Sequence, residues 1–187
     1  MLKLNEILDE KDKRLKCVSK EVKFPLTEKD INIINNSIEY LTNSQLEENL
    51  ENEKFRPGMG LAAIQLGIPK RYFVIVEELP TGEHDPQKFK NYIVVNPKVV
   101  SHSEEMIYAE LGEGCLSVNR EVPGIVPRHA RITIEGFNEL GEPIKIRARE
   151  ELSIAFQHEI DHLNGILFFE RIDKTDPFNG ENTMRSI

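Results

Sequence analysis

Cysteine is scarce in this chain. Its 187 residues include two cysteines, Cys17 and Cys115, which lie 98 positions apart. Small secreted domains use several closely spaced disulfides to compensate for a thin core, so this pattern is a poor disulfide framework. We therefore expect a protein of a reducing, cytoplasmic compartment.

Long apolar runs and long basic runs are also missing. No apolar stretch approaches the roughly 20 residues of a membrane-spanning helix, and the first stretch of the chain mixes charges without an apolar signal region. Acidic residues outnumber basic residues by 32 to 24, which gives a formal charge of −8. Nucleic-acid grooves gain affinity mainly by neutralising phosphates. The sequence therefore predicts no membrane span and no direct nucleic-acid groove.

The length and an apolar content of 39% predict one domain over residues 1–187, with residues 174–187 as a polar tail. A helix is predicted from Thr27 to about Asn49. Its apolar side chains recur at spacings of three and four: Ile31, Ile34, Ile38 and Leu41. Thr27 is placed to cap the first turn, with Asp30 three positions later.

Strands are predicted after this helix. The runs at 72–76 and 92–96 are rich in β-branched and aromatic residues, and residues 130–137 and 143–149 alternate apolar with polar residues as in a hairpin. A second helix is predicted from about Glu150 to Asn164, with one apolar stripe that ends at Gly165. Strands without regular β-α alternation and one late buried helix predict an α+β fold.

The second predicted helix contains His158-Glu159-Ile160-Asp161-His162. Imidazoles four positions apart point to one side of a helix and can hold a single metal ion, with Glu159 between them. Because the pattern is short, an accidental spacing on a charged helix is the alternative. Asp161 either orients a ligand through a hydrogen bond or is a solvated charge.

A catalytic divalent metal usually takes three protein ligands and keeps one position for water. The metzincin pattern would place histidine at position 168, where this chain has Phe168. Glu170 follows the motif too closely, and Glu181 lies in the weakly patterned tail. Cys115, in a glycine-containing turn, is the remaining candidate, although a lone cysteine is more often a buried filler. A thiolate beside two neutral imidazoles would suit zinc or iron.

Three short segments of the chain are sequence motifs that together are typical of one protein family. They are Gly58-Met59-Gly60-Leu61-Ala62-Ala63-Ile64-Gln65, Glu113-Gly114-Cys115-Leu116-Ser117 and Gln157-His158-Glu159-Ile160-Asp161-His162. In this order and spacing they resemble the peptide deformylases. Loop-rich segments before Arg56 and around Gly82 and the short tail resemble the Gram-positive-style, type 2 branch. The resemblance implies antiparallel β-sheets around a central helix that carries the His-Glu-x-x-His motif, together with an N-terminal helix.

The resemblance also implies a reaction. Members of the family remove the formyl group from the N-terminal formyl-methionine of newly synthesised polypeptides and release formate. Cys115, His158 and His162 would bind one divalent metal, typically ferrous iron, which zinc, nickel or cobalt can replace. The partners would be formyl-methionine nascent peptides and, transiently, the ribosome.

The motif positions imply roles for single residues. Glu159 would be the general base and acid for a metal-bound water, and the Gln65 side chain and the Leu116 backbone N–H would hold the developing oxyanion. Gly60 would present its backbone to the substrate. Ile64 stands where many members have proline, so we expect a less constrained loop and an altered wall of the cleft.

Two other functions remain open. The His-Glu-x-x-His helix also occurs in metallopeptidases that cut internal amide bonds, although this chain lacks their conventional third ligand. A non-catalytic module that binds ribosomes or nascent chains would close its metal site with a fourth protein ligand.

Overall fold

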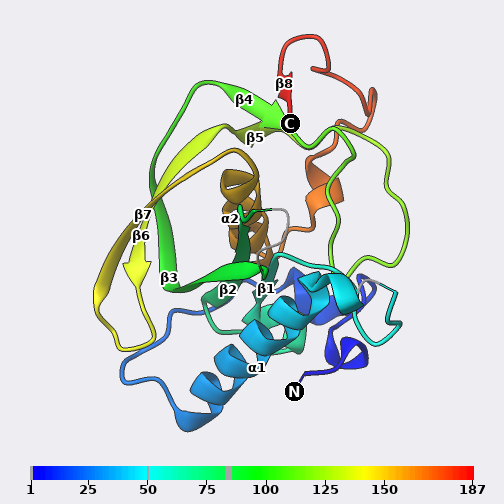
Figure 1. Cartoon of the computed structure of the whole chain (residues 1–187). Coiled ribbons are helices and arrows are strands. Elements are labelled where there is room, and N and C mark those ends of the chain that lie inside the picture. Colours follow the sequence, from blue (N-terminus) through cyan, green and yellow to red (C-terminus); the bar gives the residue numbers. More distant parts are fainter. Residues whose placement is uncertain (1, 50, 83–85) are drawn as a thin grey trace.

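Figure 1 shows the computed structural model, which describes residues 2–49, 51–82 and 86–187. Two helices, α1 (Glu28–Gln45) and α2 (Glu150–Leu163), pack against two sheets. The larger sheet is antiparallel throughout and consists, in spatial order, of β1 (Gly60–Ala62), β2 (Tyr72–Leu79), β3 (Lys88–His102), β6 (Arg131–Phe137) and β7 (Pro143–Arg149). The smaller sheet consists of β5 (Arg128–His129), β4 (Met106–Tyr108) and β8 (Arg185–Ser186), with β8 parallel to β4.

Helix α2 occupies the centre of the molecule in Figure 1 and contacts strands of both sheets. The α+β fold with antiparallel pairing around the motif helix is therefore confirmed. Short 3-10 turns complete the description: η1 (Leu4–Glu6), η2 (Lys13–Lys16), η3 (Glu47–Asn49), η4 (Ala63–Leu66) and η5 (Phe168–Arg171). Within the described residues, neither α-helix is both long enough and apolar enough to span a bilayer.

Helix α1 begins as the sequence predicts. The Thr27 hydroxyl accepts a hydrogen bond from the Asp30 N–H (3.2 Å), and the Asp30 carboxylate accepts one from the Thr27 N–H (3.3 Å). The helix ends at Gln45, four residues earlier than the sequence indicates. The Gln45 amide donates to the carbonyls of Gly58 and Val76 at 3.1 Å each, which ties the helix end to the sheet.

Strand β2 is buried on both faces, which explains its continuous apolar run. Tyr72, Val74 and Val76 belong to the apolar cluster under α1, whereas Phe73 and Ile75 belong to the cluster under α2. Side chains alternate between the faces of a strand, so both helices are held by the same five residues.

Strand β3 extends beyond the predicted run. Its pairing with β6 is shifted between Val95 and Lys98, where Asn96 has a positive φ of 52°. The shift is a bulge that accommodates Pro97, which has no N–H for the ladder. The Asn96 side chain fixes the bulge through hydrogen bonds to the backbone of Val22 (2.8 and 2.9 Å).

Helix α2 ends at Leu163, and Gly165 contributes to its C-terminal cap as the sequence predicts. Gly165 has a φ of 74°, its N–H donates to the His162 carbonyl, and the Ile166 N–H donates to the Asp161 carbonyl. This is a Schellman cap. A Cβ at position 165 would also lie 2.5 Å from the Lys16 carbonyl oxygen, so glycine lets the N-terminal segment pack against this end of α2.

Candidate metal centre and its cavity

Helix α2 and the loop that follows β4 bring three soft ligands together. His158 and His162 lie one turn apart on α2 and are both buried, and Cys115 lies in the loop. The Cys115 Sγ is 3.2 Å from the His162 Nε2, which is 3.2 Å from the His158 Nε2. All three ligand atoms lie within 4.8 Å of one another, so residues 43 and 47 positions apart in the chain converge on one point.

The loop holds Cys115 by a tight turn. The Val118 N–H donates to the Cys115 carbonyl (3.1 Å), and the Ser117 N–H approaches the sulfur at 3.4 Å. The Gln65 amide approaches the same sulfur at 3.7 Å. Two donors therefore face this sulfur and hold it in place.

Glu113 fixes the ring of His158. One Glu113 oxygen lies 2.9 Å from the His158 Nδ1, and Arg128 donates to both oxygens at 2.7 and 2.9 Å. An Nδ1–H that donates to a carboxylate leaves the Nε2 lone pair free for a metal. Burial raises the pKa of Glu113, but hydrogen bonds from Arg128 and His158 outweigh it and lower the pKa to about 2. The carboxylate therefore stays ionised.

Asp161 extends this network away from the cavity. It accepts a hydrogen bond from the buried Arg128 at 2.6 Å and forms a second ion pair with Arg171. Asp161 is 3% exposed, so the solvated-charge interpretation is wrong. The interpretation that Asp161 orients a metal ligand through a hydrogen bond also changes. Hydrogen bonds connect Asp161 to His158 through Arg128 and Glu113. The sequence analysis did not identify Arg128 as a site residue. The feature that could have indicated it is a charged residue directly after the apolar run 125–127.

Glu159 has an oxygen without a partner. The residue is 3% exposed, and its Oε2 makes no hydrogen bond within the described part of the chain. Burial raises the pKa of Glu159 to about 7. A Cβ on Gly60 would lie 2.4 Å from the Glu159 Oε1, so the glycine provides the space that this carboxylate occupies.

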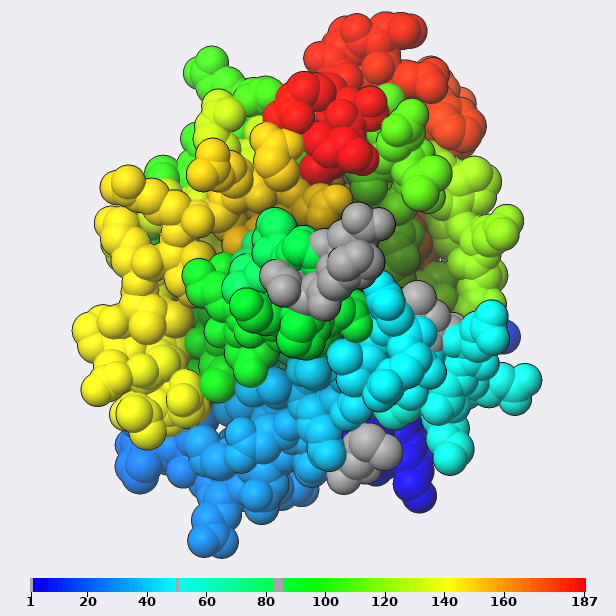
Figure 2. All heavy atoms as spheres, in the orientation of Figure 1, coloured from blue at the N-terminus to red at the C-terminus, as the bar shows by residue number. Residues whose placement is uncertain are grey.

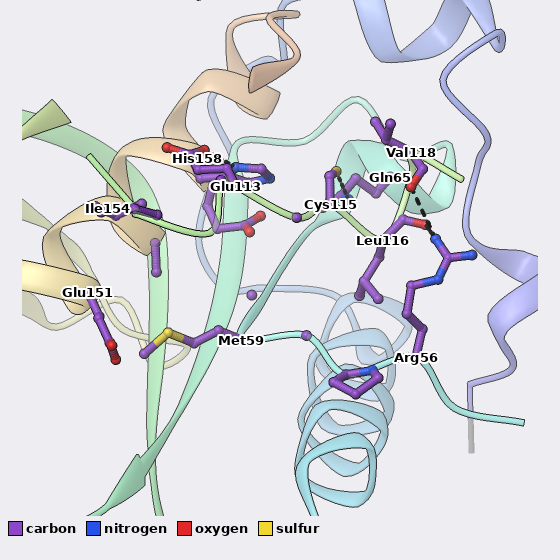
Figure 3. Close-up of a pocket in the computed structure, with 18 of the residues that line it drawn as sticks. Arg56, Met59, Gln65, Glu113, Cys115, Leu116, Val118, Glu151, Ile154 and His158 are labelled. Carbon is purple, nitrogen blue, oxygen red and sulfur yellow. Dashed lines mark hydrogen bonds and ion pairs between the residues drawn. The ribbon is translucent and has the colours of Figure 1, made fainter. Parts of the chain in front are cut away.

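The Gln65 amide is held by two hydrogen bonds. Its Oε1 accepts from the Ala62 N–H (2.9 Å), and its Nε2 donates to the Ser117 hydroxyl (3.1 Å). Figure 3 shows Gln65, Cys115 and Leu116 grouped on one side of the cavity. Among the described residues, no acceptor is bonded to the Leu116 N–H. Two donors thus lie beside the three ligand atoms.

Seven of the residues described above line one cavity of about 730 Å³: Gly60, Gln65, Glu113, Cys115, Leu116, His158 and Glu159. In the space-filling view the surface is hollowed between the segment around residues 55–60 (cyan) and the loop after β4 (green) (Figure 2). Apolar lining comes from Met59, Leu116, Ile154 and Ala155. Ile64 is not part of the lining. It packs with Phe73 and Phe156 in the core, so the expected change in the cleft wall is wrong.

The donor set fits a divalent metal. Burial lowers the pKa of His162 well below its usual value, which keeps this imidazole neutral as a ligand must be. Burial also acts to lower the pKa of His158, but Cys115 and Glu113 raise it overall, so a metal ion at this nitrogen would have to displace a proton. Within the described residues no fourth such ligand joins the group. Three-ligand centres are typical of catalytic sites.

Two histidines on one helix face a loop cysteine, and a buried carboxylate with one free oxygen lies beside them, which is the arrangement of a hydrolase with a metal centre. Residues 4–178 match the family model described as polypeptide deformylase. The chain therefore belongs to the polypeptide deformylase family.

Similar sequences indicate which branch of the family the chain resembles. The chain is 43% identical over 178 residues to "Peptide deformylase 2" of Bacillus anthracis and to the protein of the same name in Bacillus subtilis, with 95% of this chain and 94% of each relative covered. These names agree with the type 2 branch that the loop-rich segments and the short tail indicate.

Solved structures show the same fold. The peptide deformylase of Thermus thermophilus superposes with a TM-score of 0.71 at 30% identity, and the match covers 91% of this chain and 86% of the Thermus thermophilus chain. A class I type b enzyme of Acinetobacter baumannii, determined with Met-Ala-Ser bound, has a TM-score of 0.68 at 29% identity and covers 89% and 96%.

Proposed function

We propose that this enzyme removes the N-formyl group from the N-terminal formyl-methionine of newly made polypeptides and releases formate. Family membership supports the reaction. The observation that carries the mechanism is the buried Glu159 carboxylate, whose Oε2 has no hydrogen-bond partner among the described residues and which lines the same cavity as Cys115 and His158. Formyl-methionine peptides are new translation products, so we also propose a cytoplasmic enzyme with transient ribosome contact.

The metal would be held by the Cys115 sulfur and the Nε2 atoms of His158 and His162. We propose ferrous iron, which zinc, nickel or cobalt can replace, because a thiolate with two imidazoles suits these ions. When bound, the ion supplies Lewis acidity and lowers the pKa of water from 15.7 toward about 7. Glu113 and Arg128 contribute by fixing the His158 ring.

Glu159 is proposed to move the proton. Its carboxylate takes a proton from water as the water oxygen bonds to the formyl carbon, and returns it to the amine nitrogen as the C–N bond breaks. The products are formate and a free N-terminal amine. A pKa of about 7 suits both steps, because the group can accept and donate a proton near neutral pH.

Gln65 and Leu116 are proposed to stabilise the negative charge that develops on the formyl oxygen. The Gln65 Nε2 has two hydrogens, of which one is donated to Ser117 and the other faces the Cys115 sulfur at 3.7 Å; this second, weaker contact is the one that would be given up for the formyl oxygen. The Leu116 N–H supplies the second donor. One such preorganised donor contributes roughly 3–4 kcal/mol to transition-state stabilisation.

The substrate backbone is proposed to pair with the segment at Gly60. Strand β1 is an edge strand of the larger sheet, with β2 as its one neighbour, so its other edge can bind an extended peptide. The apolar lining at Met59, Ile154 and Ala155 suits a methionine side chain. The structure of the Acinetobacter baumannii enzyme with Met-Ala-Ser bound supports a peptide that begins with methionine as the occupant.

The test uses nickel-loaded protein and formyl-Met-Ala-Ser, with formate as the product measured. The wild-type enzyme should release formate, and Glu159→Gln should retain the metal and lose at least about 10²-fold in kcat. Unformylated Met-Ala-Ser serves as the control for peptidase activity. Near-normal formate release by Glu159→Gln would overturn the mechanism, and cleavage of the unformylated peptide would favour the metallopeptidase alternative.

A further inference from the structure

Arg56 connects the two walls of the cavity. It lies four residues before the start of β1, and its half-buried side chain reaches the loop that follows β4 (Figure 3). The Arg56 Nη1 donates to the carbonyls of Leu116 (3.2 Å) and Val118 (3.4 Å), and the Nη2 donates to the side-chain oxygen of Asn119. All three acceptors are uncharged groups of one loop. The guanidinium therefore serves this loop, and within the described part of the chain no carboxylate pairs with it.

The backbone of Arg56 is fixed separately from its side chain. The hydroxyl of Tyr40, on α1, accepts a hydrogen bond from the Arg56 N–H (3.1 Å) and donates one to the Arg56 carbonyl (3.4 Å). Tyr40 is fully buried, and its ring centre lies 5.7 Å from that of Phe55. We therefore expect this segment to keep its course when the guanidinium is removed.

The turn that Arg56 contacts contains the proposed backbone oxyanion donor. The peptide group that carries the Leu116 N–H has its carbonyl on Cys115, and this carbonyl accepts from the Val118 N–H (3.1 Å). The next peptide group joins the Leu116 carbonyl, bonded to Arg56, to the Ser117 N–H, which faces the Cys115 sulfur. Since a peptide group is planar, a bonded carbonyl also fixes the direction of its N–H. Arg56 thus holds two carbonyls of the turn that orients the Leu116 N–H.

The Leu116 side chain provides a second contact between the walls. A Cβ on Gly58 would lie 3.0 Å from the Leu116 Cγ, so the glycine lets the two segments approach closely. Gly58 lies two residues before Gly60, whose backbone is proposed to bind the substrate. The oxyanion donor is therefore placed relative to the substrate-binding segment by Gly58 through its side chain and by Arg56 through its backbone.

We propose that Arg56 is a positioning residue, which holds the turn 115–118 so that the Leu116 N–H faces the formyl oxygen. The inference rests on the proposed deformylase function and adds a residue to its mechanism. A displacement of about 1 Å at a reacting group costs on the order of 10²-fold in rate, so loss of the guanidinium should lower kcat about 10- to 100-fold. KM should change by less than about threefold, because the donor acts on charge that develops in the transition state.

The experiment measures formate release from formyl-Met-Ala-Ser by nickel-loaded variants. Arg56→Met keeps the apolar stem and removes every donor. Arg56→Lys should return kcat to within about threefold of wild type, because one ammonium can donate to both carbonyls as the Nη1 does. Thermal unfolding and nickel content are measured for each variant, so that loss of the fold or of the metal is recognised.

Arg120→Met is the matched control. Arg120 lines the same cavity, but its guanidinium is paired with Glu10 and is not bonded to the turn 115–118. This variant removes the same charge from the cavity and should keep the wild-type kcat. An equal loss in Arg120→Met and Arg56→Met would attribute the effect to the charge of the cavity and would overturn the positioning role.

A backbone substitution tests whether Arg56 acts through Leu116. Replacing Leu116 by the corresponding α-hydroxy acid exchanges the N–H for an ester oxygen and keeps the side chain. In this background Arg56→Met should lower kcat by less than about twofold, because the donor that Arg56 positions is already absent. A loss as large as in the unmodified backbone would show that Arg56 acts by another route.

The wild-type enzyme separates this inference from the proposed function. Formate release by the wild type together with unchanged kcat in Arg56→Met would overturn the positioning role and leave the function intact. Absence of formate from the wild type would overturn the function. In that case hydrogen exchange of the Val118 N–H, which is bonded to the Cys115 carbonyl, still tests the turn. Exchange should be faster in Arg56→Met than in wild type, and equal rates would contradict the contact that the proposal requires.

Discussion

Gly60 and Glu159 depend on each other at the scale of single residues. Gly60 lies in an edge strand, and Glu159 lies on the central helix, yet no side chain at position 60 fits beside the Glu159 carboxylate. The glycine is thus required by packing as well as by the proposed backbone contact with substrate.

Gly60→Ala should therefore disable the enzyme while leaving it folded. The new methyl group would lie 2.4 Å from the Glu159 Oε1, so the carboxylate must move. A displacement of about 1 Å at a reacting group costs on the order of 10²-fold in rate. Steady-state kinetics with a thermal unfolding control checks this, and unchanged kcat would show that the carboxylate has freedom that the packing does not indicate.

Gln65→Leu should lower kcat about 10²–10³-fold, because one oxyanion donor is removed. The cost to folding should be about 1–3 kcal/mol, since the Ala62 N–H loses its buried acceptor. Kinetics and urea unfolding of the same preparation separate the two effects. A loss of less than threefold in kcat would remove Gln65 from the proposed mechanism.

The residues that the sequence identified are those with short-range signals. The His158–His162 spacing and the cysteine after Gly114 are local sequence motifs of three to five residues. Glu113 and Arg128 are not, because their partners lie 15 to 45 positions away. The expectation for Ile64 failed for a related reason, since the 3-10 turn η4 directs this side chain into the core while its neighbour Gln65 faces the cavity.

At the scale of elements, α2 is connected to the loop after β4 by the Glu113–Arg128–Asp161 network. Arg128 is 2% exposed and forms ion pairs with both carboxylates, so the loop that carries Cys115 is joined to the helix that carries the histidines. The network positions two elements relative to each other.

Glu113→Gln should weaken metal binding about 10- to 100-fold, the usual cost of losing a partner that orients a metal ligand. The substitution keeps the shape of the side chain but removes the charge that faces His158 and Arg128. Competition with a chelator measures the affinity directly. Wild-type affinity in this variant would show that the helix holds the His158 ring without help.

Helix α1 is joined to β2 through Asp30. The buried Asp30 carboxylate accepts hydrogen bonds from Lys70 (2.6 and 2.7 Å), Thr27 (2.6 Å) and Tyr72 (3.3 Å). Burial raises the pKa of Asp30, but the hydrogen bonds from Lys70 and Thr27 outweigh it, so the pKa lies below its usual 3.8.

This shift predicts a pH-dependent contribution to stability. A carboxyl with a lowered folded pKa stabilises the fold above its unfolded pKa, and the contribution is lost as the pH falls through the folded value. Asp30→Asn should reduce the free energy of unfolding by about 1–3 kcal/mol at pH 7. The difference from wild type should shrink below about pH 4. Urea unfolding across this range checks it, and a difference independent of pH would contradict the ionic origin.

Element prediction succeeded where the pattern is local. Capping residues and apolar periodicity located both helices, and the alternation around 138–141 located the β6–β7 hairpin. Strand β8 was not predicted because it consists of two polar residues. Its pairing partner β4 lies 78 positions away, with Ile107 opposite Arg185. Such a strand is specified by its partner and not by its own residues.

At the scale of the whole molecule, two sheets enclose one helix, and the cavity opens where the loop after β4 faces the edge strand β1. The proposed metal ligands come from helix α2 and from the loop after β4. The N-terminal segment is bonded to Gln65 and to this loop, because the Leu8 N–H donates to the Gln65 carbonyl (2.8 Å) and the Glu10 N–H donates to the Ser117 carbonyl (2.7 Å). The N-terminal segment thus helps to hold Gln65 and the loop that carries Cys115 in place.

The proposed mechanism requires one metal ion, held by Cys115, His158 and His162, for formate release. It is tested by a titration of metal-free protein with nickel while formate release from formyl-Met-Ala-Ser is recorded. We expect no activity without metal, a linear rise, and saturation at one ion per chain, with no recovery in His162→Ala. Activity in the metal-free protein, or full recovery in that variant, would contradict the mechanism.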